Sequence, residues 1–103
     1  IINGVNVFPS QIEEVIMQVP EVGTNYQIWV EKHGALDKLI VNVEVYPKMF
    51  KGDASQLEQL RSRIIEQLRG TILINPTVRL HEPGFLPVSQ GKAQRVIDKR
   101  PKL

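Results

Sequence analysis

The sequence predicts an α+β fold in which a small mixed or antiparallel sheet carries two main helices. Two segments repeat apolar residues with the period of a helix, and several shorter segments alternate apolar and polar residues as strands do. Their order along the chain is strand, helix, hairpin, helix, strand and loop. This order is typical of a ferredoxin-like (split βαβ) arrangement with an added C-terminal loop. Residues 1–103 are enough for one domain with one core.

The first predicted elements are a short strand or turn over residues 1–7 and a helix that starts near Pro9. Residues 1–7 are rich in β-branched side chains and contain a central glycine, Gly4. Pro9 suits the first turn of a helix because its φ is already fixed, and Pro20 is expected to end the helix. The apolar stripe that would face the core consists of Ile12, Val15, Ile16 and Val19.

A β-hairpin is predicted from residues 26–31 and 39–46. In both segments apolar side chains occupy every second position, as in strands with one buried face. The link between them, residues 32–38, contains Gly34 and enough polar residues to face water. No functional site is needed to explain this link.

A second helix and a further strand follow. Ser55 and Glu58 match a capping box at the start of the helix, and Gly70 is expected to end it. The apolar stripe of this helix consists of Leu57, Leu60, Ile64 and Leu68. Residues 77–81 then read as a strand, and a short helical turn is expected at residues 93–97.

The composition excludes several classes of function. The chain has no cysteine, which excludes disulfides, thiol nucleophiles and cysteine-based zinc sites. His33 and His81 are isolated in the sequence and have no carboxylate at a helical ligand spacing, so no metal site is expected. The apolar runs are too short to span a bilayer and no secretory signal is visible, so we expect a cytoplasmic protein with no membrane partner. Because the chain begins at Ile1, inside an apolar stretch and without Met, we expect it to be part of a longer protein.

Positive charge is concentrated near the C-terminus, although the net charge is only +2. Five of the thirteen Lys and Arg residues lie in the last twelve positions, namely Lys92, Arg95, Lys99, Arg100 and Lys102. Such a local charge can serve a phosphate-bearing ligand, a nucleic acid or solubility.

The irregular segment around Gly91 and Lys92 is the strongest candidate for chemistry. Binding and catalytic groups are often carried by loops on a rigid scaffold. This segment is not a Walker loop, because position 93 is Ala and the required earlier glycine is missing. A lysine can nevertheless stabilise negative charge that develops in phosphoryl or acyl-phosphate chemistry. From the residues alone, that role and a simple solvent-exposed lysine are equally favoured.

Two segments together, residues 2–14 and 86–98, resemble two motifs of the adenylate-forming acyl-CoA ligases. The first reads INGVNVFPSQIEE and the second LPVSQGKAQRVID. Both motifs lie in the mobile C-terminal domain of that family, in the same order and at a similar separation. The resemblance covers essentially the whole chain. The residues within them at 8–11 and 95–98 are similar to those of an aryl-acetate-type ligase.

The resemblance implies a two-step reaction. A carboxylate first attacks the α-phosphate of ATP to give an acyl-adenylate and pyrophosphate, and coenzyme A then displaces AMP. Lys92 matches the catalytic lysine of the first step and, with Gly91, would contact ATP and the acyl-adenylate. The domain then rotates, and Asn3, Gly4 and Val5 would line the coenzyme A side of the site. For Gly4 an ordinary tight turn remains an equal interpretation.

The resemblance also implies the partners. The chain would work with its own N-terminal adenylating domain, which would bind ATP, Mg²⁺ and most of the aryl carboxylate. This chain alone would be inactive and bind no cofactor, and the full-length enzyme could be a homodimer. The alternatives are a small-molecule-binding regulatory domain of ACT type, which leaves Lys92 unexplained, and an RNA-binding sheet. The acidic residues and the lack of a paired aromatic motif argue against a nucleic acid partner.

Overall fold

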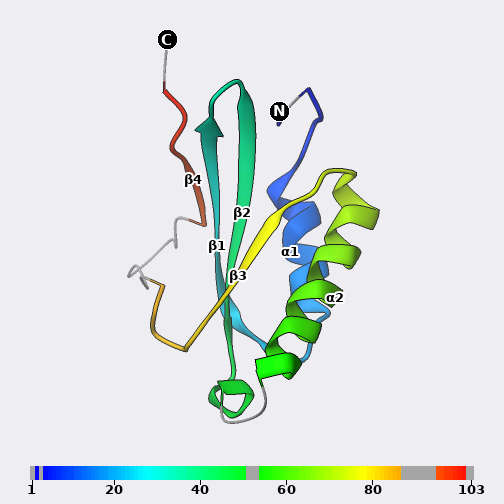
Figure 1. The fold of residues 1–103 in the computed structure, drawn as a ribbon, viewed down its shortest axis with the longest axis vertical. Helices are drawn as coiled ribbons and strands as arrows, with labels where there is room; N and C mark the ends of the chain where they lie inside the picture. Colours follow the sequence, from blue (N-terminus) through cyan, green and yellow to red (C-terminus); the bar gives the residue numbers. More distant parts are fainter. Residues whose placement is uncertain (1, 3, 51–53, 87–94, 102–103) are drawn as a thin grey trace.

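The computed structural model describes residues 2, 4–50, 54–86 and 95–101. Among these residues, four strands form one sheet in the order β3-β2-β1-β4 (Figure 1). The strands are β1 (Val22–His33), β2 (Leu36–Val45), β3 (Thr77–His81) and β4 (Val96–Asp98). β1 and β2 are antiparallel, whereas β3 is parallel to β2 and β4 is parallel to β1. The sheet is therefore mixed.

The β1–β2 hairpin is longer than the sequence predicts. β1 continues to His33 and β2 starts at Leu36, so that most of the expected link is strand. The pairing across this end brings Glu31 opposite Lys38 and Lys32 opposite Asp37. Opposite charges on facing positions stabilise a strand pair, which explains why this polar stretch is extended.

Both main helices, α1 (Pro9–Met17) and α2 (Ala54–Ile72), cover the same face of the sheet (Figure 1). A short 3-10 helix, η1 (Pro47–Phe50), follows β2. The predicted apolar stripes are buried, apart from Leu57, which is partly buried. The helices pack on the strand residues Tyr26, Ile28, Val30, Leu39, Val41, Val43 and Val78. Burial of these two stripes confirms the predicted helices and the α+β class.

The predicted ends of α2 are wrong. The helix begins at Ala54, so Ser55 lies in its first turn and does not precede it. It also continues through Gly70, because Ile72, four residues after Leu68, is buried on the same face. The residue that leaves the helix is Leu73, with a φ of 63° and a backbone N–H that donates to the Arg69 carbonyl at 3.0 Å.

The topology differs from a split βαβ unit. β2 and β3, which α2 connects, are direct neighbours, so no strand lies between them. The expected helical turn at residues 93–97 is also wrong where it can be compared, since Val96–Asp98 form β4. β4 pairs with the edge of β1 that the hairpin leaves open, which satisfies backbone groups there. No described helix combines the length and the apolar character that a bilayer span requires.

Candidate functional site

The two segments singled out by the sequence are described to different extents. Gly91, Lys92 and Asn3 lie outside the described residues, whereas Gly4 and Val5 lie within them. The name lysine segment is used for residues 87–94, which Leu86 and Arg95 flank. The described part of the site consists of the N-terminal turn and of the residues that hold Leu86 and Arg95.

Gly4 lies in a tight reversal of the chain. The backbone N–H of Ile2 donates to the Val5 carbonyl at 2.8 Å, and the N–H of Val5 donates to the Ile2 carbonyl at 2.9 Å. Gly4 has a φ of 79°, which side-chain-bearing residues rarely adopt. A Cβ at this position would meet no atom of the described residues within 4 Å. The turn therefore requires glycine for its backbone conformation, and the space beside it is open.

Glu44 of β2 holds the chain at Gly84 and Leu86, where the lysine segment begins. Its Oε1 accepts the backbone N–H of Gly84 at 3.1 Å, and its Oε2 accepts that of Leu86 at 2.8 Å. The side-chain amide of Asn25 donates to the same Oε2 at 3.0 Å and to the Leu86 carbonyl at 3.5 Å. Glu44 is 7% exposed and Leu86 3%. A carboxylate can be buried in this way because charge-assisted hydrogen bonds replace its water.

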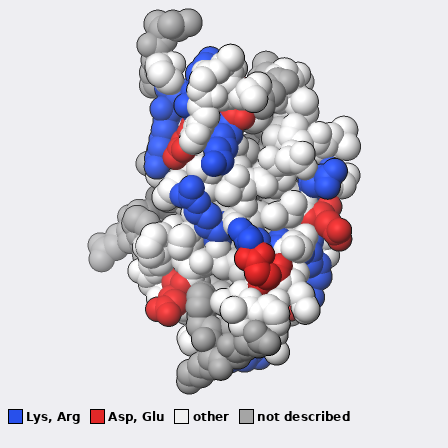
Figure 2. All heavy atoms as spheres, in the orientation of Figure 1, with Lys and Arg blue, Asp and Glu red and all other residues white. Residues whose placement is uncertain are grey.

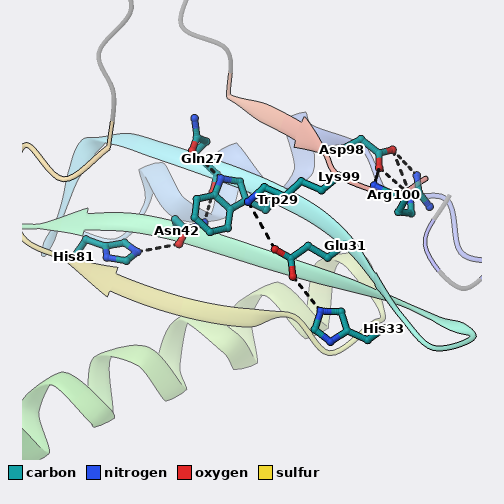
Figure 3. Close-up of polar contacts among 9 residues, drawn as sticks. All are labelled: Gln27, Trp29, Glu31, His33, Asn42, His81, Asp98, Lys99 and Arg100. Carbon is teal, nitrogen blue, oxygen red and sulfur yellow. Dashed lines mark hydrogen bonds and ion pairs between the residues drawn. The ribbon is translucent and has the colours of Figure 1, made fainter. Parts of the chain in front are cut away.

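The residues before Leu86 are held by an aromatic stack. The rings of His81 and Phe85 are stacked with centroids 4.0 Å apart. His81 Nε2 donates to Oδ1 of Asn42 at 2.8 Å, and the Asn42 amide donates to the Gln27 carbonyl at 3.4 Å (Figure 3). Burial, with a smaller contribution from Arg79, lowers the pKa of His81 below its usual value. His81 is therefore stabilised as the neutral ring.

Arg95, the first described residue after the lysine segment, is held by residues of β1. Its carbonyl accepts the N–H of Ile28 at 2.6 Å, and its guanidinium lies 4.5 Å from the centre of the Tyr26 ring. Burial, followed by a hydrogen bond to Glu13, raises the pKa of Tyr26 to about 12. Tyr26 is therefore a neutral, buried platform under a cation, a favourable arrangement.

Arg100 fixes the chain after β4. Its guanidinium contacts Asp98 at 2.7 Å and Asp37 of the hairpin at 3.2 Å. The hydrogen bonds from Arg100 lower the pKa of Asp98 to about 2. Nearby, Lys99 Nζ lies 3.7 Å from the centre of the Trp29 ring (Figure 3). Figure 2 shows that basic side chains gather on this side of the molecule, with acidic ones between them.

A small cavity brings the N-terminal segment and β4 together. Its volume is about 160 Å³, and its walls include Ile2 and Val7 from the first segment and Val96 from β4. The two motifs that are far apart in the sequence thus flank the same part of the sheet. The described residues contain no group of three or more His, Asp or Glu side chains that could hold a metal ion.

Two helices on one face of a mixed sheet, with the N-terminal segment and β4 beside one cavity, form a small α+β module. The chain belongs to the family of AMP-binding enzyme C-terminal domains, whose model matches residues 4–100 and so spans the whole lysine segment. It is 38% identical to the phenylacetate-coenzyme A ligase of Aromatoleum evansii over 99% of this chain and 24% of that protein. The chain therefore spans about a quarter of the length of this relative.

Solved structures agree with this family. A domain of phenylacetate-coenzyme A ligase from Bacteroides vulgatus superposes with a TM-score of 0.89 at 38% identity, covering 100% of this chain and 93% of that one. A 2-hydroxyisobutyryl-CoA ligase, in complex with 2-HIB-AMP and CoA in the thioesterification state, gives a TM-score of 0.87 at 28% identity. That match covers 97% of this chain and 21% of the ligase. None of the relatives and structures named above is an ACT domain, so these comparisons do not favour the ACT alternative.

Sequence reasoning missed Glu44 and the partners of Tyr26. In the alternating pattern of residues 39–46, Glu44 falls on the polar face, and such a position is usually exposed. One signal was present, because Glu44 lies between Val43 and Val45 in a strand with a long apolar run. Such runs are typical of strands covered on both faces, where a carboxylate needs partners.

Proposed function

We propose that this chain is the C-terminal domain of an AMP-forming CoA ligase that acts on an aryl acetate such as phenylacetate. The observation that carries the proposal is the similarity to phenylacetate-coenzyme A ligase along 99% of the chain, including both motif segments. The acyl-adenylate and CoA bound by the 2-hydroxyisobutyryl-CoA ligase support ATP and CoA as co-substrates of the whole protein.

The proposed reaction has two steps. In the first, an oxygen of the substrate carboxylate attacks the α-phosphorus of ATP, and pyrophosphate leaves with the electron pair of the broken P–O bond. In the second, the thiol of CoA attacks the acyl carbon, loses its proton, and AMP leaves. The first step builds negative charge on the phosphate oxygens, which a fixed cation stabilises.

Lys92 is proposed as the catalytic residue of the first step. Its ammonium would contact the carboxylate and phosphate-ribose oxygens and hold them in line, while Gly91 lets the backbone approach the nucleotide. In the second step the domain would rotate. Asn3, Gly4 and Val5 would then line the CoA side. Mg²⁺ is expected with ATP on the adenylating domain, since none of the described residues is arranged to hold it.

Half-reactions of the full-length enzyme test this proposal. Lys92→Ala should lower adenylation, measured as acid-dependent exchange of pyrophosphate into ATP, by about 10²–10³-fold or more, the cost of removing a group that stabilises developing charge. Thioester formation from supplied acyl-adenylate and CoA should stay within a few-fold of wild type. Lys99→Ala, which removes a lysine that contacts Trp29 and Glu31, is the matched control and should affect neither step. Equal losses in both half-reactions would contradict the assignment.

The full-length protein is expected to be needed for activity. The chain alone should not catalyse either step, because the acyl and nucleotide pockets would belong to the adenylating domain. A cytoplasmic location fits the supply of ATP and CoA, and a homodimeric full-length enzyme remains a prediction.

A further inference from the structure

Glu44 is unusual because its charged side chain is buried. Among the described residues it is the one charged residue that is buried, at 7% exposure, while the ion pair of Glu58 with Arg61 is exposed and that of Glu21 with Arg63 is partly exposed. Removing a carboxylate from water costs several kcal/mol, and apolar replacement of a buried charge is often neutral or stabilising. Stability alone therefore gives a weak reason for a carboxylate here.

What the carboxylate does is fix the backbone. Its two oxygens hold the N–H groups of Gly84 and Leu86, two residues apart, at 3.1 and 2.8 Å. Two donors on two oxygens set both the position and the direction of the chain, because such bonds are sensitive to angle as well as distance. Asn25 adds a third donor to Glu44 and also binds the Leu86 carbonyl, so it braces the same point.

The two described residues that flank the lysine segment are both bonded to one short stretch of β1. Leu86 contacts Asn25, and the Arg95 carbonyl accepts from Ile28. Lys92 follows Leu86 by six residues and precedes Arg95 by three. Removing the Glu44 carboxylate would loosen the first of these two flanks and leave the second, at Arg95, in place.

We propose that Glu44 is a positioning residue for adenylation: by holding Gly84 and Leu86 it sets the place from which Lys92 acts. This inference rests on the proposed function, because it needs Lys92 as the adenylation lysine. Positioning is a large part of such catalysis, and a displacement of about 1 Å can cost about 10²-fold in rate. Glu44 itself would touch neither substrate nor nucleotide.

Glu44→Gln in the full-length enzyme is the primary test. The amide keeps the shape and one acceptor oxygen but replaces the other by an NH₂ group, so one of the two backbone N–H groups loses its acceptor. We expect kcat for adenylation to fall about 10- to 100-fold with KM for ATP and the acid nearly unchanged. Thioester formation from supplied acyl-adenylate should stay within about twofold, because that step does not use Lys92.

Two controls separate positioning from a general loss of structure. Glu21→Gln removes a carboxylate that pairs with Arg63 of α2, away from the lysine segment, and should leave both half-reactions unchanged. In a Lys92→Ala background, Glu44→Gln should cause no further loss of adenylation, because the group it positions is already gone. Asn25→Ala is the second variant, to be used if Glu44→Gln does not fold, and should slow adenylation alone by about 2- to 10-fold.

The outcomes distinguish this inference from the proposed function. If Lys92→Ala leaves adenylation intact, the proposed function fails. If Lys92→Ala abolishes adenylation but Glu44→Gln and Asn25→Ala are neutral, only the positioning role fails. A loss shared equally by both half-reactions, or a loss by Glu44→Gln that persists undiminished in the Lys92→Ala background, would also overturn the positioning role.

Discussion

Nε2 of His81 lies 2.8 Å from Oδ1 of Asn42, a side chain with 0% exposure in the middle of the sheet. The contact joins β3 to β2 on the face opposite the helices. It also holds the ring on which Phe85 stacks, just before the chain reaches Leu86. A neutral histidine is thus part of the support for the lysine segment.

The pH dependence of stability should reflect His81. Burial lowers its pKa in the folded chain, so on acidification the unfolded chain takes up the proton first. The stability that depends on the neutral ring is therefore present above the ordinary pKa of about 6.5 and is lost as the pH falls toward the lower folded value. His81→Gln should reduce the fall in the free energy of unfolding between pH 7 and about 5.5, measured by urea denaturation. An unchanged slope would contradict this prediction.

Substitutions at Gly4 can separate its two interpretations. If only the turn matters, Gly4→Ala should be more harmful than Gly4→Asn, because asparagine tolerates a positive φ better than alanine. If bulk in the CoA path matters, Gly4→Asn should be the slower enzyme, because asparagine is larger and the described residues leave the space beside Gly4 open. We expect thioester formation to follow size and the free energy of unfolding to follow tolerance of the turn. Thioester rates that follow turn tolerance would contradict the gating role.

Leu73→Gly should stabilise the chain. Leu73 has a φ of 63° and is 79% exposed, so glycine relieves backbone strain and removes little packing. We expect a gain of about 0.5–1 kcal/mol in the free energy of unfolding, since strain of about 1–2 kcal/mol is partly offset by the greater freedom of glycine in the unfolded chain. Leu73→Ala keeps the Cβ and should show no such gain. The midpoints of urea unfolding would show the difference.

Tyr26 should lose its proton only at a high pH. Its pKa is raised to about 12, chiefly by burial, so the folded chain holds this proton more tightly than the unfolded chain does. The resulting stability is present below pH 10 and is lost as the pH rises through the folded value. In an absorbance titration of tyrosinate, Tyr26→Phe should remove the component near pH 12, whereas Tyr46→Phe should keep it. A late component that survives in Tyr26→Phe would show that another group is responsible.

The sequence is sufficient for the features that depend on near neighbours along the chain. The stripe of Ile12, Val15 and Ile16 and the burial of Tyr26 and Val43 on one face of the hairpin follow from periodicity, because side chains on one buried face must recur with the period of their element. Gly70 does not end α2, although the sequence predicts that it does. The helix continues to Ile72, and whether Ile72 is buried depends on the sheet that packs against it. β4 has only three residues and too little pattern to be recognised.

By itself, then, the sequence determined the α+β class, the buried faces of both helices and of the hairpin, and the two segments that carry the family motifs. The tertiary structure decided the strand order, the parallel pairing of β4 with β1, and the role of Glu44 at Leu86. These features join residues far apart in the chain, such as Glu44 and Leu86, which are 42 positions apart. No local pattern encodes them, because the partner of an open strand edge or of a buried carboxylate is chosen only when the whole chain has packed.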